Sequence, residues 1–175
     1  MESPIPIIFL IRSYNRPDYL LKTIKSVLTS DIDLSLKRYI YDDSSTDELT
    51  LELLSNQVYM SVTGKEFIVV KNQTNRGCKF SYIDALNYVK KDNEDINQYI
   101  ICTVDNDVEV NTKFISTLYS EYKNASQEYN QHVLLTGFNA SNAHKNFLKD
   151  HTNFYRKKSI GGVNILYFIV IFLIL

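Results

Sequence analysis

The sequence has few cysteines, with Cys78 and Cys102 alone among 175 residues. Two cysteines provide neither a disulfide framework nor the spacing of a zinc site. Cys102 lies in an apolar segment, where a free cysteine behaves as a small hydrophobic residue. The first four residues, Met-Glu-Ser-Pro, lack the basic segment and the long apolar stretch of a secretory signal. We therefore expect a reduced, cytoplasmic protein.

The sequence also lacks an excess of positive charge. Its 19 lysines and arginines are balanced by 20 acidic residues, which gives a net charge of −1. Without a broad basic field, nucleic acid is not expected as a partner, whereas a small anionic ligand held locally is compatible with this charge. A hydrophobic content of 45% and the absence of repeats or linkers indicate a single globular domain over residues 1–175.

Short apolar segments alternate with amphipathic patterns. The apolar segments predict strands over residues 7–11, 38–41, 67–70, 99–104 and 132–136. Helical spacing predicts helices on the residue sets Leu20, Leu21, Ile24, Val27 and Leu28; Leu49, Leu53 and Leu54; Phe80, Ile83, Leu86 and Val89; and Phe114, Ile115, Leu118 and Tyr122. Pro17 suits the first helical turn, and Ser45 with Glu48 has the spacing of a capping box. The expected fold is a three-layer α/β/α sandwich with a mainly parallel sheet.

An acidic triplet, Asp105-Asn106-Asp107, directly follows the apolar segment 99–104. A buried parallel strand that ends in two carboxylates delivers both to the sheet edge where α/β proteins bind ligands. Hard oxygen ligands suit Mg²⁺ or Mn²⁺, which in turn can bind a diphosphate. A plain turn is the alternative interpretation. An EF-hand is excluded because Val110 occupies the position at which that loop needs glycine.

Polar loops follow the other predicted strands as well. They are Ser13-Tyr14-Asn15-Arg16, Asp42-Asp43-Ser44-Ser45 and Asn75-Arg76-Gly77. Together with the acidic triplet, and in this order, they resemble the family 2 glycosyltransferases of the GT-A fold, over roughly residues 5–120. The resemblance implies an inverting transfer of a sugar from a nucleoside-diphosphate sugar, with UDP favoured, to a glycan, protein or lipid acceptor. It also implies Mn²⁺ or Mg²⁺ as a cofactor.

The resemblance implies a nucleotide-sugar-binding set and a metal-binding pair. The nucleotide-sugar-binding set is Tyr14, Asn15, Arg16, Asp43, Arg76, Asp105 and Asn106, and the metal-binding pair is Asp107 and Asp105. Within these sets the Tyr14 ring would contact the base, and Asp43 would accept a hydrogen bond from the base or the ribose. Asp107 would be the direct metal ligand.

The sequence departs from the family pattern at two places. Many members carry an Arg-Asn pair on the helix after the Asn-x-Gly loop, where this chain has Tyr82 and Ile83. Inverting members also use an acidic residue beyond a glycine turn as the general base. Here no Asp, Glu or His follows Gly162, so the catalytic base is unknown.

The resemblance divides the chain into a nucleotide-sugar-binding half, residues 1–120, and a partial acceptor-side half, residues 121–175. The latter ends in an apolar tail, residues 165–175, which is too short to span a bilayer. A buried strand or a truncated end is favoured for this tail over contact with a membrane surface. A truncated or degenerate nucleotide-binding remnant without turnover is the second hypothesis. A nucleotidyltransferase and a phosphoacceptor signalling domain rank last.

Overall fold

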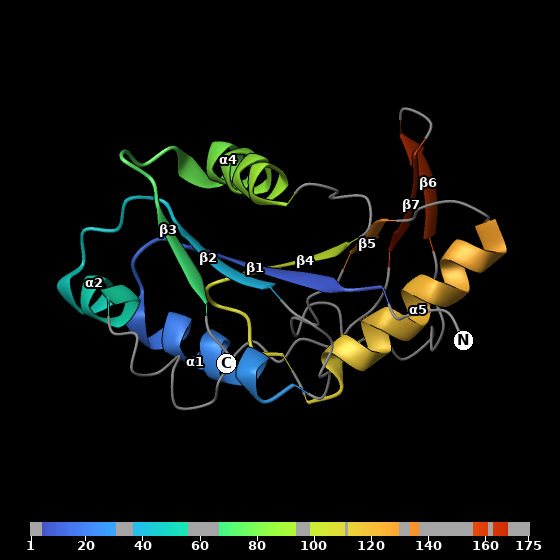
Figure 1. Ribbon diagram of the computed structural model, residues 1–175, viewed down its shortest axis with the longest axis horizontal. Helices are drawn as coiled ribbons and strands as arrows, with labels where there is room; N and C mark the ends of the chain where they lie inside the picture. Colours follow the sequence, from blue (N-terminus) through green and yellow to red (C-terminus); the bar gives the residue numbers. More distant parts are fainter. Residues whose placement is uncertain are drawn as a thin grey trace. The chain divides into compact units, whose positions relative to one another are not determined.

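The computed structural model describes most of the first 129 residues and three short strands beyond them (Figure 1). The described ranges are 5–30, 37–55, 67–93, 99–110, 112–129, 134–136, 156–160 and 163–167. The chain forms two compact units. The first joins Met1–Leu28 to Asp33–Asp107, and the second joins Thr29–Ile32 to Val108–Leu175. The functional halves on either side of residue 120 stay a prediction.

The first unit contains a four-stranded sheet in which neighbouring strands are parallel. Its order is β3-β2-β1-β4, with β1 at Ile7–Ser13, β2 at Lys37–Asp42, β3 at Ile68–Lys71 and β4 at Ile100–Asp105. β1 lies inside the sheet, and its first five residues are buried, as expected for a strand covered on both faces. The four strands predicted for this part of the chain are confirmed to within two residues at each end.

Helices cover both faces of this sheet (Figure 1). Helix α4 (Gly77–Asp92) lies on one face, and α1 (Pro17–Leu28) and α2 (Glu48–Ser55) lie on the other. On the α4 face, alternate residues of β1 and β2 pack against the helix. This cluster consists of Ile8, Leu10, Tyr39, Tyr41, Ala85 and Val89. The predicted three-layer α/β/α architecture is therefore confirmed.

Two local predictions were wrong, one of them in part. The predicted stripe of α4 is right at its end, where Val89 is buried and Leu86 packs against the core, but Phe80 and Ile83 are exposed. Ser81 and Ala85 are buried on the helix instead. The capping box of Ser45 with Glu48 is replaced by a cap from Asp47. Its Oδ1 accepts the backbone N–H of Thr50 at 2.8 Å, because α2 begins at Glu48.

The second unit has its own secondary structure. Helix α5 spans Phe114–Tyr129, and a three-stranded sheet has the order β5-β7-β6, with β5 at Leu134–Thr136, β6 at Arg156–Ile160 and β7 at Val163–Tyr167. β7 runs parallel to β5 and antiparallel to β6. The first part of the apolar tail is thus a strand. The glycine pair at 161–162 and residues 168–175 lie outside the described residues.

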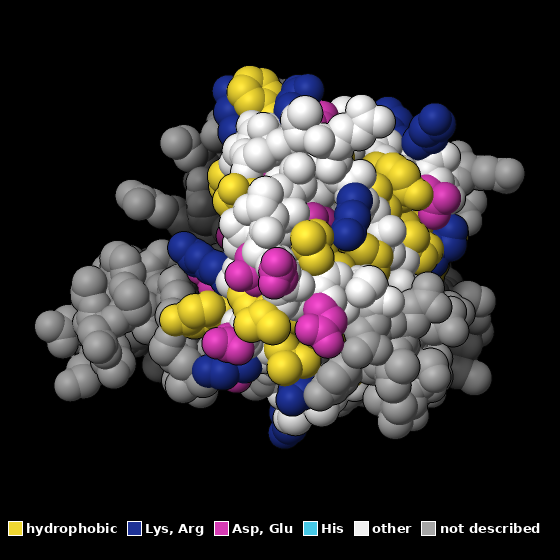
Figure 2. All heavy atoms as spheres, turned by 90° about the vertical axis from the view of Figure 1, so that its left-hand side faces the viewer, with side chains coloured by type: hydrophobic (Ala, Val, Ile, Leu, Met, Phe, Trp, Pro, Cys, Tyr) yellow, Lys and Arg dark blue, Asp and Glu magenta, His cyan; other side chains and the backbone are white. Residues whose placement is uncertain are grey.

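Charges of both signs are interspersed with apolar side chains on the face drawn in Figure 2. Among the apolar side chains exposed in the first unit are Leu49 of α2, Ile68 of β3 and Phe80 of α4. Within the described ranges, no helix is both long and apolar enough to cross a bilayer.

Candidate functional site

The ends of the four parallel strands align at one edge of the sheet. In the strand register, Ser13 of β1 lies beside Asp42 of β2, and Asp42 lies beside Lys71 of β3. On the other side of β1, Arg12 lies beside Asp105 of β4. The loops that follow these strands therefore begin at a common edge, which is where open α/β sheets bind ligands.

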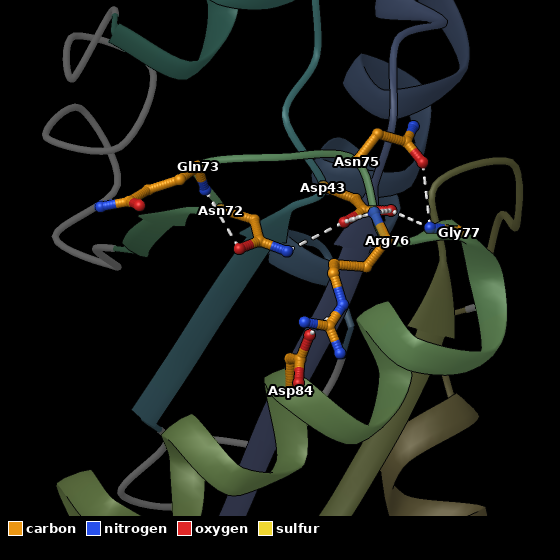
Figure 3. A network of polar contacts seen from close by, with 7 residues as sticks. All are labelled: Asp43, Asn72, Gln73, Asn75, Arg76, Gly77 and Asp84. Carbon is orange, nitrogen blue, oxygen red and sulfur yellow. Dashed lines mark hydrogen bonds and ion pairs between the residues drawn. The ribbon is translucent and has the colours of Figure 1, made fainter.

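Asp43 is the polar centre of the loops after β2 and β3 (Figure 3). Its carboxylate, which is almost fully buried, accepts the backbone N–H of Arg76 at 3.0 Å and that of Gly77 at 2.9 Å. The side-chain amide of Asn72 donates to the same carboxylate at 3.1 Å. These charge-assisted hydrogen bonds fix the entry to α4, since they satisfy backbone donors that the first helical turn leaves free.

Arg76 lies at the surface of this loop. Its Nε is 3.6 Å from Oδ2 of Asp84, which lies about two helical turns along α4. Its guanidinium lies 5.5 Å from the ring centre of Phe80. Both contacts leave the side chain about half exposed, so it remains available to an anionic ligand.

Burial, and then the nearby Asp84 and Asp43 carboxylates, raise the pKa of Tyr41, so its hydroxyl stays neutral.

The side chain of Asn15 links the loop after β1 to the start of α2. Its Oδ1 accepts the backbone N–H of Thr46 at 2.9 Å and that of Asp47 at 3.1 Å. In return, the Ser45 hydroxyl accepts the Asn15 N–H at 2.7 Å and donates to Asp42. The Asn15 side chain thus holds the loop, and its left-handed φ of 53° suits an asparagine.

Asn106 and Asp107 connect the end of β4 to the same loop. The Asn106 side-chain amide donates to the Asn15 carbonyl at 3.1 Å, and Arg16 donates to Oδ2 of Asp107 at 2.9 Å. The Arg16 and Asp107 side chains are 61% and 41% exposed, so solvent screens this pair and a ligand can displace it. The nearby Tyr14 side chain is also exposed, with its ring free to contact a planar ligand.

Arg12, near the end of β1, holds the other carboxylate of the triplet. It forms an ion pair with Asp105 and donates to the carbonyl of Cys78 at 2.8 Å. Its guanidinium also lies 5.1 Å from the ring centre of Tyr82. Burial by itself would lower the pKa of Arg12, but the contacts with Cys78 and Asp105 outweigh it and the pKa is raised. The Arg12 charge is therefore permanent.

The site offers few protein ligands for a divalent cation. The described residues contain no group of three or more His, Cys, Asp or Glu side chains able to hold a metal together. Asp107 offers a partly exposed carboxylate, which is the hard oxygen ligand that Mg²⁺ and Mn²⁺ prefer. Such a cation is compatible with Asp107 if water and a bound diphosphate complete its coordination.

All the site residues predicted from the sequence lie on loops or strand ends at this edge, but they form two contact groups. Asp43 and Arg76 belong to the β2–β3 side, and Asn15, Arg16, Asn106 and Asp107 belong to the β1–β4 side. Arg12, Asn72 and Asp84 were not among the site residues predicted from the sequence. The sequence feature that could have indicated Arg12 is its position as the single charged residue in an otherwise apolar strand.

Comparisons with known proteins agree with this architecture. Residues 9–168 match the family described as glycosyl transferase family 2. No curated protein matches the sequence significantly. A crystal structure of S. aureus TarS 1–349 in complex with UDP superposes with a TM-score of 0.56 at 17% identity, covering 78% of this chain and 36% of that one. GalNAc-T7 with UDP, GalNAc and Mn²⁺ gives 0.58 at 14% identity, covering 79% and 24%.

The chain thus spans about a third of the TarS fragment and about a quarter of GalNAc-T7. At these identities the superpositions establish the fold, and the family match covers most of the chain. The protein belongs to glycosyl transferase family 2 and has the GT-A fold.

Proposed function

We propose that the carboxyl edge of the β3-β2-β1-β4 sheet binds a nucleoside-diphosphate sugar and that the protein transfers the sugar to an acceptor. The observation that carries this proposal is the convergence of Asp43, Arg76, Asp105 and Asp107 on one edge of a family 2 domain. Carboxylates and arginines at such an edge suit the hydroxyls, imide and phosphates of a nucleotide.

The structural contacts suggest how the loops divide this work. Tyr14 stacks on the base, and Arg16 and Arg76 supply exposed positive charge for the diphosphate. Asn15 and Asn106 act by holding the loop after β1, since their side chains are hydrogen-bonded within it. Asp43 fixes the β3–α4 loop and accepts a hydrogen bond from base or ribose if one of its present donors shifts.

A divalent cation, Mn²⁺ or Mg²⁺, fits Asp107 as the protein ligand. When bound, it would neutralise the charge that develops on the departing diphosphate. The chain's contribution is to release Asp107 from Arg16, an exchange that costs little because both side chains are exposed. UDP is the favoured nucleotide and inversion the favoured outcome, and the general base is unassigned.

A second candidate is a protein that binds the nucleotide without turnover. The observation that favours it is that the described residues at the sheet edge are accounted for by nucleotide and cation binding, and none of them is assigned as a general base. Both candidates bind the nucleotide at the same site, but only the first hydrolyses the donor or transfers its sugar.

The test is a calorimetric titration with UDP and UDP-sugars, with and without Mn²⁺, together with a donor-hydrolysis assay. We expect binding that depends on Mn²⁺ and is lost in Asp107→Asn, whereas Glu52→Gln, an exposed carboxylate on α2, binds as the wild type does. Hydrolysis supports the transferase, and binding without hydrolysis supports the second candidate. Absence of nucleotide binding under both conditions would contradict the proposal.

A further inference from the structure

The side chain of Arg12 joins three elements of the first unit. It is the only charged residue in β1, and its guanidinium reaches β4 and the first turns of α4. One nitrogen donates to the Cys78 carbonyl at 2.8 Å and lies 3.3 Å from its sulfur, while another pairs with Asp105. The Tyr82 ring lies beside the guanidinium. These contacts give the guanidinium one orientation.

The two arginine–carboxylate pairs of the site differ in how firmly they are held. The Arg16 side chain is 61% exposed, and among the described contacts Asp107 is its only side-chain partner. The Arg12 side chain is 15% exposed and is also anchored by Cys78 and Tyr82, although its partner Asp105 is 55% exposed. Because other contacts already order the Arg12 guanidinium, it loses little further entropy in pairing with Asp105. Asp107 is therefore released to a ligand more easily than Asp105 is.

Asp105 and Asp107 are one residue apart and are the two carboxylates predicted to share a cation. A divalent cation bound by both carboxylates would have two negatively charged protein ligands, whereas a cation bound by Asp107 alone has a single such ligand. Arg12 offsets the charge of Asp105 and occupies one of its two oxygens, so it weakens that carboxylate as a ligand for the cation.

We propose that Arg12 is a positioning residue that holds Asp105 away from the divalent cation bound by Asp107. The cation then binds weakly by itself and tightly only when a nucleoside diphosphate adds its own oxygens. Asp105, held by Arg12, is left to the ribose side of the nucleotide. The inference rests on the proposed function.

The test is a titration with Mn²⁺ alone, in which electron paramagnetic resonance measures the free ion. Arg12→Met frees Asp105, and we expect the affinity for Mn²⁺ to rise about tenfold. Arg12→Lys keeps the positive charge, so its affinity for Mn²⁺ should rise less. Lys22→Met removes a cation that lies over Tyr19 on α1 and should leave the affinity unchanged.

A double variant identifies the source of the gain. Arg12→Met combined with Asp105→Asn should return to the wild-type affinity. A merely structural role for Arg12 would lower the melting temperature without raising the affinity for Mn²⁺. If Arg12→Met does not unfold cooperatively, Arg12→Gln replaces it, because a glutamine can still donate to the Cys78 carbonyl.

The proposal is overturned if no folded Arg12 variant binds Mn²⁺ more tightly, or if the gain persists in the double variant. Because the titration contains no nucleotide, its result is separate from the proposed function, which fails on the absence of UDP binding by the wild type.

Discussion

The carboxylate of Asp43 accepts the backbone N–H of Gly77 at 2.9 Å across a separation of 34 residues. This hydrogen bond connects the end of β2 to the first residue of α4. It fixes the distance between two loops that the proposed function assigns to the same ligand. The stability of the sheet edge and the geometry of the site therefore depend on the same carboxylate.

Replacing Asp43 should destabilise the protein strongly. Asp43→Ala leaves the Arg76 N–H and the Asn72 side-chain amide without this acceptor, while the Gly77 N–H keeps Asn75 Oδ1 as its second acceptor. We expect a loss of about 3 kcal/mol in the free energy of unfolding. Urea denaturation followed by circular dichroism measures it. Glu52→Gln, on an exposed face of α2, should stay within about 0.5 kcal/mol of wild type. Equal effects of the two substitutions would show that the Asp43 contacts do not stabilise the edge.

The conformation of Gly77 makes a separate prediction. Its φ is +74°, and a Cβ added there would meet nothing within 4 Å. The cost of Gly77→Ala therefore comes from the left-handed backbone alone and should be about 1–2 kcal/mol. Gly77→Asn should cost less, because asparagine tolerates this conformation. Thermal unfolding of the two variants decides the order, and a larger loss for Asn than for Ala would count against this explanation.

Tyr39 should make the stability fall at high pH. Burial, followed by the hydrogen bond to Asp92, raises the pKa of Tyr39 to about 12 from an ordinary value of 10.0. The folded state holds this proton more tightly, so the contribution is complete below pH 10 and is lost as the pH rises to 12. We expect Tyr39→Phe to flatten the decline by about 1 kcal/mol over this window.

Cys102 titrates in an overlapping window, since burial raises the pKa of its thiol to about 12. The proteins with tyrosine and with phenylalanine at position 39 should therefore both carry Cys102→Ala. Their free energies of unfolding are compared at pH 9 and pH 11.5. The same decline with tyrosine and with phenylalanine at position 39 would be inconsistent with this linkage.

The two cysteines should differ in reactivity. Cys78 is exposed at the start of α4, and Cys102 lies within β4 with a raised pKa. Ellman's reagent should label one thiol rapidly in the native protein and the second on unfolding. UDP with Mn²⁺ should slow the labelling of Cys78, because the proposed ligand lies at the same loop. Unchanged labelling at saturating nucleotide would place the ligand elsewhere.

The strands and the layer order could be predicted because β1, β2 and β4 are short apolar segments followed by polar loops. The exposure of Phe80 and Ile83 on α4 could not be predicted, since their helical spacing to the buried Val89 matches a single buried face. The point at which the helix begins is fixed by long-range hydrogen bonds that the Arg76 and Gly77 N–H groups donate to the Asp43 carboxylate.

The cap of α2 was mispredicted for a similar reason. Ser45 has the right spacing, but its hydroxyl is committed to Asp42 and to the Asn15 N–H. Contacts between distant segments also explain why Arg12 was overlooked. A lone arginine in a strand gives no indication of its partners, and both Cys78 and Asp105 are more than 60 residues away.

The central claim is that nucleotide and metal bind together at the carboxyl edge of the first unit. Paramagnetic broadening of amide signals by Mn²⁺ in the presence of UDP tests it directly. The account predicts broadening at Arg16, Gly77 and Asp107, and sharp signals at Asp92 and Asn93, which lie near Tyr39 and Lys37 at the amino edge. Broadening centred on Asp92 and Asn93, or spread evenly over the sheet, would contradict it.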